Sequence, residues 1–220
     1  MKTTAEILAN SPLFKGIPSY SINPMLGCLK ARERSYGKNE FILNAGVSSA
    51  EIGIVLSGSV QIIKEDIWGN VTILAQLGEG MLFGEAFALA GVDTIPVSVY
   101  TVKPSRIIFL DRDRTVTPCS ASCEFHHDVS HNMLSILSQK NMFLTERMEH
   151  LSKRTLREKI LSYLSDVSIK TGKNEFDIPF DRQGLADYLA SDRSAVSSVL
   201  SKLKAEGILD YNKNHFVLIK

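Results

Sequence analysis

The spacing of hydrophobic residues changes along this chain of 220 residues and divides it into regions with different predicted secondary structure. Between residues 35 and 111, short apolar runs alternate with glycine-containing turns, which predicts many short β-strands in a small sandwich or barrel. Short helices are expected before this region, over 3–12 and 19–32, and the segment 84–91 predicts one helical turn between strands. The runs read as strands are 41–43, 52–56, 60–63, 71–74, 97–102 and 106–110.

From about residue 125 to residue 151 the pattern becomes that of one long helix. Leucines recur every seven residues, with methionines beside them, which indicates a coiled-coil-like seam. Lys140 and Arg147 interrupt the seam, and a long helix packed on its own β-domain would give the same pattern. We therefore expect one face on the β-domain and the other on a second copy of the chain. The seam residues are Met133, Leu137, Leu144, Met148 and Leu151.

After a further amphipathic helix over 152–174, the chain predicts two short capped helices. Asp181 can cap a helix over about 182–189, because its carboxylate accepts from unpaired N–H groups of the first turn. Ser191 and Asp192 offer a second cap for a helix that begins at Arg193 and is stopped by Gly207.

The outward face of this last helix carries one guanidinium and otherwise small hydroxyls: Arg193, Ser194, Ser197, Ser198 and Ser201. Small side chains let a helix enter a groove, and hydroxyls can bond to phosphates or base edges. Apolar strands over 208–211 and 216–219 flank Asn-Lys-Asn, which predicts a hairpin and hence a winged helix-turn-helix. The alternative is an ordinary helical hairpin and β-ribbon that pack on a core.

The composition limits where such a protein can hold DNA. Its net charge is only +1, so affinity for phosphates must come from a local patch. No signal peptide or membrane-spanning run is apparent, and three cysteines indicate a reducing compartment. We therefore expect a cytoplasmic protein. The candidate patch consists of Arg182, Arg193, Lys202, Lys204 and Lys213.

The order of β-sandwich, long helix and winged helix-turn-helix resembles the cyclic-AMP-receptor and fumarate-nitrate-reduction regulator (CRP/FNR) superfamily of bacterial transcription factors. The local marks of the resemblance lie at 11–14, 54–60, 80–85 and 181–197. It implies an α+β fold with a β-roll sensor (a double-stranded β-helix) over 1–125, a dimerisation helix over 126–152 and a DNA-binding domain over 153–220.

The resemblance also implies partners and contact residues. The expected partners are double-stranded DNA with a two-fold operator, a second copy of the chain, RNA polymerase and an unidentified small-molecule effector. Arg182 and Gln183 match phosphate-contacting positions, and Arg193, Ser194, Ser197 and Ser198 match base-reading positions. Many members carry an arginine where this chain has Ser198, so the usual half-site preference is not expected here.

An effector pocket is implied inside the roll, but its chemistry departs from the family pattern. Cyclic-nucleotide binders carry Arg-Ser where this chain has Ile95-Pro96, so the countercharge for a cyclic phosphate is missing and we do not expect cyclic AMP as effector. Glu85 either stands where a ribose hydroxyl would bond or braces the roll. The expected lining is Phe83, Gly84, Glu85, Ala88, Ile95, Pro96, Val97 and Val99, and its apolar members suit an uncharged ligand.

Two cysteines near the start of the long helix are the other chemistry-bearing cluster. Cys119 and Cys123 precede His126. Together, these side chains could provide soft ligands for zinc or an iron–sulfur centre. Reduced structural thiols, a thiol redox switch and a bound metal all remain open. The oxygen-sensing branch of the resembled family takes its cluster ligands from a cysteine-rich N-terminus, which this chain lacks. Three single histidines, His131, His150 and His215, are expected at the surface.

Three classes of function follow from these features. The first is a DNA-binding transcription regulator that responds to a small molecule or to a redox signal. The second, an enzyme on a cupin-like barrel, is not favoured, since no histidine precedes His126 and the metal ligands of such a barrel are lacking. The third is a constitutive DNA-binding protein with a vestigial sensor domain.

Overall fold

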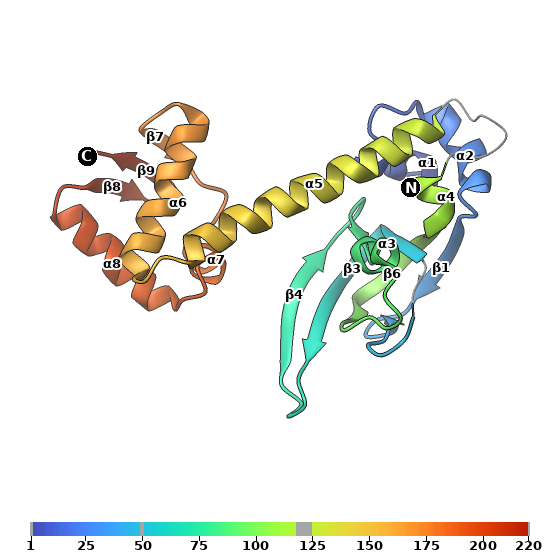
Figure 1. Cartoon of the computed structure of the whole chain (residues 1–220), viewed down its shortest axis with the longest axis horizontal. Helices are drawn as coiled ribbons and strands as arrows, with labels where there is room; N and C mark the ends of the chain where they lie inside the picture. Colours follow the sequence, from blue (N-terminus) through green and yellow to red (C-terminus); the bar gives the residue numbers. More distant parts are fainter. Residues whose placement is uncertain (1, 49–50, 118–124, 220) are drawn as a thin grey trace. The chain divides into compact units, whose positions relative to one another are not determined.

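The computed structural model describes residues 2–48, 51–117 and 125–219. The chain forms two compact units, Met1–Ser138 and Gln139–Lys220, and each has its own hydrophobic core (Figure 1). The long helix α5 (His126–Leu151) contributes its first half to one unit and its second half to the other.

The first unit begins with short helices and continues as an antiparallel sheet. Helix α1 (Thr4–Ala9) starts with a capping box between Thr3 and Glu6, and α2 (Ser19–Cys28) follows a turn of 3-10 helix at Pro12–Phe14. The strands are β1 (Arg32–Tyr36), β2 (Phe41–Leu43), β3 (Glu51–Glu65), β4 (Val71–Leu77), β5 (Leu82–Phe83) and β6 (Ser98–Asp111).

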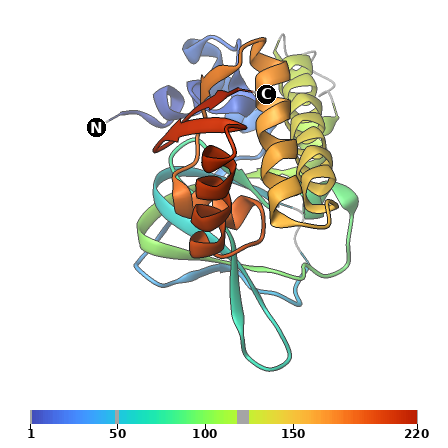
Figure 2. The same ribbon diagram turned by 90° about the vertical axis from the view of Figure 1, so that its left-hand side faces the viewer.

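All strand pairs of this sheet are antiparallel, in the order β1-β6-β3-β4, with β2 also paired to β6 and β5 to β3. The two longest strands, β3 and β6, pair over most of their length, and the β3–β4 hairpin projects from the rest of the unit (Figure 2). Helix α3 (Glu85–Ala90) lies between β5 and β6, where one helical turn was predicted. Helix α4 (Arg112–Val116) follows β6 and was not predicted.

Two pairs of predicted strands are single strands in the structure. Residues 52–56 and 60–63 both belong to β3, which continues through Gly58 at φ 97°. A Cβ at Gly58 would lie 2.1 Å from Ser105 Oγ, and this hydroxyl accepts from Ser59 N at 3.1 Å. The glycine therefore bends the strand against its neighbour and does not end it. Pro104 lies opposite this irregularity, and β6 likewise runs through both of its predicted segments.

Besides the second half of α5, the described part of the second unit contains the helices α6, α7 and α8 and a small sheet. Thr155 and Glu158 form a capping box at the start of α6 (Leu156–Thr171). The helices α7 (Arg182–Tyr188) and α8 (Arg193–Ala205) follow, with bounds close to the predicted ones. The sheet has the order β7-β9-β8, with β7 (Glu175–Asp177), β8 (Leu209–Asn212) and β9 (His215–Leu218). Strand β7 was not predicted.

Candidate nucleic-acid interface

The first turn of α7 is held by a side-chain cap. Asp181 Oδ1 accepts from Gly184 N at 2.7 Å, which confirms the predicted cap. The cap places Arg182 and Gln183 in the first turn, near the positive end of the helix dipole. Gln183 Nε2 donates to Asp187 Oδ1 at 2.8 Å along the exposed side of the same helix.

Helix α8 has the two faces expected from its sequence. Val196, Leu200 and Leu203 have no solvent exposure and form part of the core of the second unit. Arg193, Ser194 and the following serines lie on the other side, where most are exposed. Asp192 is the N-cap residue of this helix, as predicted, but its side chain makes no capping hydrogen bond.

Two serine hydroxyls of α8 are turned back onto their own helix. Ser197 Oγ donates to Arg193 O at 2.9 Å, and Ser201 Oγ donates to Ser197 O at 3.0 Å. Ser201 Oγ also lies 3.3 Å from the Tyr211 hydroxyl. Because the hydroxyl hydrogen of Ser197 bonds to its own helix, this oxygen would accept a hydrogen bond from an amino group of cytosine or adenine in a major groove.

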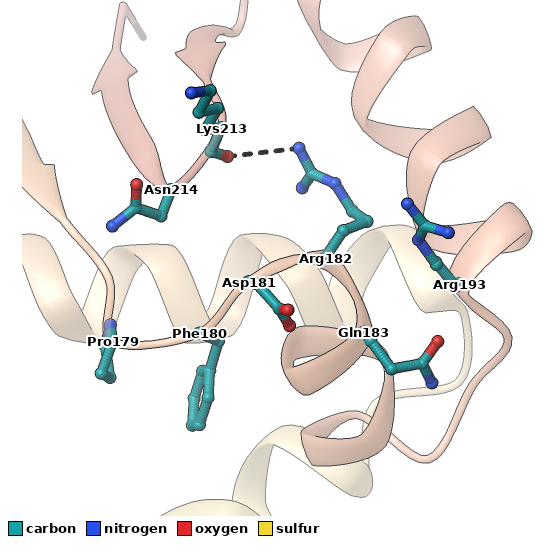
Figure 3. Close-up of a pocket in the computed structure, with 8 residues that line it drawn as sticks. All are labelled: Pro179, Phe180, Asp181, Arg182, Gln183, Arg193, Lys213 and Asn214. Carbon is teal, nitrogen blue, oxygen red and sulfur yellow. Dashed lines mark hydrogen bonds between the residues drawn. The ribbon is translucent and has the colours of Figure 1, made fainter.

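A cleft of about 720 Å³ lies between the start of α7, the start of α8 and the wing turn (Figure 3). The guanidinium groups of Arg182 and Arg193 come to it from two separate helices. Lys213 of the wing turn also lines it, with its carbonyl oxygen rather than its ammonium group turned toward Arg182. Its other lining residues are Pro179, Phe180, Asp181, Gln183 and Asn214. A concave, cationic surface next to a helix N-terminus suits a phosphate group.

Arg182 is the most constrained of these cations. Its Nη2 donates to Lys213 O at 3.4 Å, and its guanidinium carbon lies 4.9 Å from the centre of the Tyr211 ring. Partial burial is the main cause that lowers the pKa of Arg182, whereas Tyr211 raises this pKa and the nearby charge of Arg193 lowers it. An anion placed between two guanidinium groups would reduce the repulsion between their charges.

The wing turn is fastened to the segment that leads into α7. Ile178 N donates to Asn214 O at 2.9 Å, and Asn214 Nδ2 donates to Ile178 O at 3.2 Å. Lys213, at φ 57°, occupies the left-handed region at the tip of the turn. These bonds hold the backbone of the wing turn beside the segment that leads into α7.

The remaining lysines of the predicted patch lie farther along α8. Lys204 is paired with Asp210, and its Nζ lies 5.6 Å from the Tyr211 ring centre. Lys202 is exposed near the C-terminal end of the helix. Neither lines the cleft, which brings together only the other three residues of the patch.

The effector-pocket residues predicted from the sequence fall into different environments. Phe83 and Val99 belong to one apolar cluster, whereas Ala88 belongs to the core that receives the N-terminal helices. Glu85, Ile95 and Val97 are also buried, and Gly84 is half-buried. Pro96 is exposed, and its place in the lining stays a prediction.

The backbone around Ile95 is already hydrogen-bonded within the roll. Ile95 N donates to Val47 O at 2.9 Å, and Gly46 N donates to Ile95 O at the same distance. Pro96 has no N–H group. The two positions that carry Arg-Ser in cyclic-nucleotide binders therefore offer no donor to a phosphate here.

The cysteine cluster cannot be placed, because Cys119 and Cys123 lie outside the described residues. His126 has 1% exposure, and its Nε2 bonds to Arg114 O, so this nitrogen carries a proton. Within the described residues, no group of three or more His, Cys, Asp or Glu side chains is arranged to hold a metal ion.

The lone histidines differ from one another. His131 is exposed, and His215 is half-buried on β9. His150 has only 2% exposure, so the prediction that it is a surface residue is wrong. Its Nδ1 bonds to Ser162 Oγ at 3.1 Å, which satisfies the buried ring.

The predicted seam of α5 is divided between the two units. Met133 is buried in the core of the first unit, and Leu137 packs against that core. Leu144 and Met148, in the second unit, are 60% and 67% exposed, and Leu151 is half-buried. Met133 thus packs within the core of its own chain, and of the seam residues only the later ones present apolar surface to a partner.

An antiparallel β-domain followed by a winged helix-turn-helix with a cationic cleft defines a DNA-binding transcription regulator with a sensor domain. The comparisons with known proteins agree with this class. The family model described as "Cyclic nucleotide-binding domain" matches residues 33–117, and the model described as "Crp-like helix-turn-helix domain" matches residues 158–220. The chain belongs to the CRP/FNR superfamily, and the predicted fold class is confirmed.

Individual relatives are distant. The cyclic AMP receptor protein of Thermus thermophilus is 25% identical over 202 residues, which cover 92% of this chain and 89% of that protein. The transcriptional activator protein FnrL of Cereibacter sphaeroides is 34% identical over 83 residues, 34% of each chain. The structure of CprK complexed with OCPA matches with a TM-score of 0.58 at 15% identity, covering 90% of this chain and 91% of that one. None of the described helices has the length and apolarity needed to cross a membrane.

Proposed function

We propose that the protein binds a two-fold DNA operator as a homodimer and that an uncharged organic effector in the β-roll changes its DNA affinity. In this proposal, α8 enters the major groove and reads bases through Arg193, Ser194, Ser197 and Ser198. Arg182 and Gln183 contact phosphates from the first turn of α7. The observation that carries the proposal is the cleft beside the serine face of α8, which is lined by the guanidinium groups of Arg182 from α7 and Arg193 from α8 and by Lys213 of the wing turn.

The homodimer is supported by α5. Leu144 and Met148 expose large apolar side chains four residues apart on one side of the helix, and Leu151 continues this row. A two-fold protein dimer matches the symmetry of operators that contain inverted half-sites. Such a dimer would act on RNA polymerase from DNA in the cytoplasm.

An uncharged effector is supported by the residues near the predicted pocket. Phe83, Val97 and Val99 are apolar and nearly fully buried, and the Ile95 N–H group is bonded to Val47. A buried phosphodiester needs a paired cation or dense hydrogen bonding, since an unpaired charge there costs several kcal/mol. We therefore propose a ligand different from the one in the name of the Thermus relative.

The DNA-reading role is tested with Arg193→Ala on duplexes that vary at each operator position. A base-reading arginine should cost roughly 1–3 kcal/mol on the preferred operator and relax selectivity at one position. Arg154→Ala is the matched control, because Arg154 is exposed and lies outside the cleft. An equal loss on every sequence would show that Arg193 contacts only the backbone.

The effector proposal is tested by isothermal titration with cyclic AMP and cyclic GMP. We expect no heat of binding at micromolar concentrations of either nucleotide. Micromolar binding would overturn this part of the proposal and would direct the search to another cation in the roll, such as Arg106 or Arg112.

A constitutive DNA-binding protein with a vestigial sensor is the second candidate, and one observation favours it. The Phe83 ring lies so close to Gly53 that a Cβ there would be 2.2 Å from the ring, and the same ring packs edge-on against Phe109 at 6.3 Å. These aromatic rings fill part of the space inside the roll. A thermal-shift screen of small organic molecules separates the candidates, because only a working sensor is stabilised by a ligand.

Cys119 and Cys123 supply a third route to regulation, through oxidation or a bound metal. DNA affinity measured on reduced, oxidised and chelated protein, together with elemental analysis, tests it. Unchanged affinity in all three samples without bound metal would exclude it.

A further inference from the structure

An arginine on α5 holds the C-terminal end of the first helix of the helix-turn-helix. Arg147 Nε donates to Tyr188 O at 3.0 Å, and Arg147 Nη2 donates to Asp187 O at 2.9 Å. The same guanidinium lies 5.5 Å from the centre of the Tyr188 ring. All three residues belong to the second compact unit.

Helix α7 has reason to depend on this contact. It is only seven residues long, and a helix of that length needs tertiary support. In the turn that follows, Ala190 N donates to Asp187 O at 3.3 Å, so Arg147 adds a further donor to this carbonyl and a side-chain donor to Tyr188 O. A cation at this end also complements the helix dipole. Arg147 thus supports the end of α7 from outside the helix-turn-helix.

Aromatic packing surrounds the arginine contact. The Tyr188 ring centre lies 5.1 Å from both Tyr163 and Phe180, and 6.0 Å from both Phe143 and His150. Phe143 and His150 come from α5, on the side of the helix that carries Arg147. In addition, Lys170 of α6 pairs with Glu146 of α5 at 2.6 Å. The last turns of α5 are therefore joined to the DNA-binding unit by side chains from several positions.

The same turns of α5 carry the row of Leu144, Met148 and Leu151 that forms the proposed dimer contact. The angle between this row and α7 fixes where each recognition helix lies relative to the two-fold axis. We propose that Arg147 is a positioning residue that sets the half-site spacing read by the dimer. This inference rests on the proposed homodimer and its two-fold operator.

The chemistry favours arginine over lysine at this position. A guanidinium has donors in a fixed, planar fork, so it can bond to two neighbouring carbonyl oxygens and keep their direction. A lysine would keep the charge but would not fix the angle. Arg147→Lys therefore separates a positioning role from a purely electrostatic one.

The first experiment measures binding of the full chain to operators whose spacer is lengthened or shortened by one base pair. One base pair rotates a half-site by about 35° around the DNA axis. We expect Arg147→Lys and Arg147→Ala to reduce the preference for the best spacer by about tenfold, while the affinity for a single half-site stays unchanged. Arg154→Ala is the control and should keep the full preference.

The second experiment needs no DNA. Hydrogen exchange of the full chain should be about tenfold faster over residues 182–192 in Arg147→Ala than in the wild type or in Arg154→Ala. This measurement tests the anchor itself. If it is positive but no DNA is bound by the wild type, the proposed function fails and the anchor stands.

Three results would overturn the inference. One is unchanged hydrogen exchange over 182–192 in Arg147→Ala. The second is a wild-type spacer preference that both Arg147 variants retain in full. The third is an equal loss of affinity on all spacers and on the single half-site.

Discussion

Replacement of Arg182 by methionine offers a quantitative test of the phosphate contact. Methionine keeps apolar contact with the Tyr211 ring, which lies 4.9 Å from the guanidinium carbon, but removes the charge. In a homodimer the change removes two cations, one from each cleft. The slope of log K against log salt concentration falls by about 0.9 for each lost phosphate contact, hence by about 1.8 for the dimer.

This slope predicts a measurable change in affinity. Between about 50 and about 200 mM salt, the wild type should lose about twelvefold more affinity than the Arg182→Met variant. Fluorescence anisotropy over a salt series, on both the preferred operator and an unrelated duplex, gives both slopes. The two duplexes should show the same change in slope, since phosphates carry no sequence information directly.

Arg154→Met is the matched control, because it removes an exposed arginine of the same unit that does not line the cleft. An unchanged slope in Arg182→Met would refute the phosphate contact. A loss confined to the preferred operator would instead assign Arg182 to base reading.

Three further predictions concern assembly and stability. Leu144→Glu with Met148→Glu should give monomers in sedimentation, whereas Ile169→Glu, at a residue of α6 that is 76% exposed, should remain dimeric; a dimeric double variant would place the seam elsewhere. Leu200→Ala should destabilise the second unit by about 2–5 kcal/mol in denaturant melts, because Leu200 is fully buried; a change below about 1 kcal/mol would contradict the core assignment. His215 lies 3.0 Å from Asp177 and 3.2 Å from Glu175, and the hydrogen bond to Asp177 is the main cause that raises its pKa above 6.5. A raised pKa stabilises the fold fully below about pH 6.5 and loses this effect as pH rises through the raised pKa, so His215→Ala should lower the melting temperature at about pH 6 and leave it unchanged at about pH 9; equal effects at both would exclude the ion pairs.

The helix-turn-helix could be predicted from the sequence because its signals are local. The cap at Asp181, the apolar row of α8 and the stop at Gly207 each lie within a few residues of the element that they define. Strand β7 could not be predicted, because the signals that define it are not local. It is three residues long, only Phe176 in it is buried, and its partner β9 lies about 40 residues later in the chain.

Glycine and proline misled the strand predictions, since both usually mark the end of an element. Gly58 and Pro104 instead sit where β3 and β6 change register against each other. The close approach of Ser105 requires glycine at 58, but only the paired strands reveal that requirement. The pocket residue Pro96 came from the family resemblance, and in the structure it is exposed in the loop before β6.

The candidate site was predictable in its residues but not in its geometry. Arg182 and Lys213 are separated by 31 positions, and only the folded wing brings the Lys213 carbonyl to the Arg182 guanidinium. Arg147 was read as a weakness in the seam of α5. The useful signal was a single arginine next to an apolar row, but its two carbonyl partners lie about 40 residues away.

Selection of binding sites from random duplex DNA by the full-length protein tests the central claim most directly. We expect enrichment of an inverted repeat whose half-site centres are about one helical turn, or about 10–10.5 base pairs, apart or a multiple of this. With the Arg193→Ala variant, enrichment should be lost at the operator position that Arg193 reads. A selection that enriches no sequence, or only an isolated site without two-fold symmetry, would contradict the account.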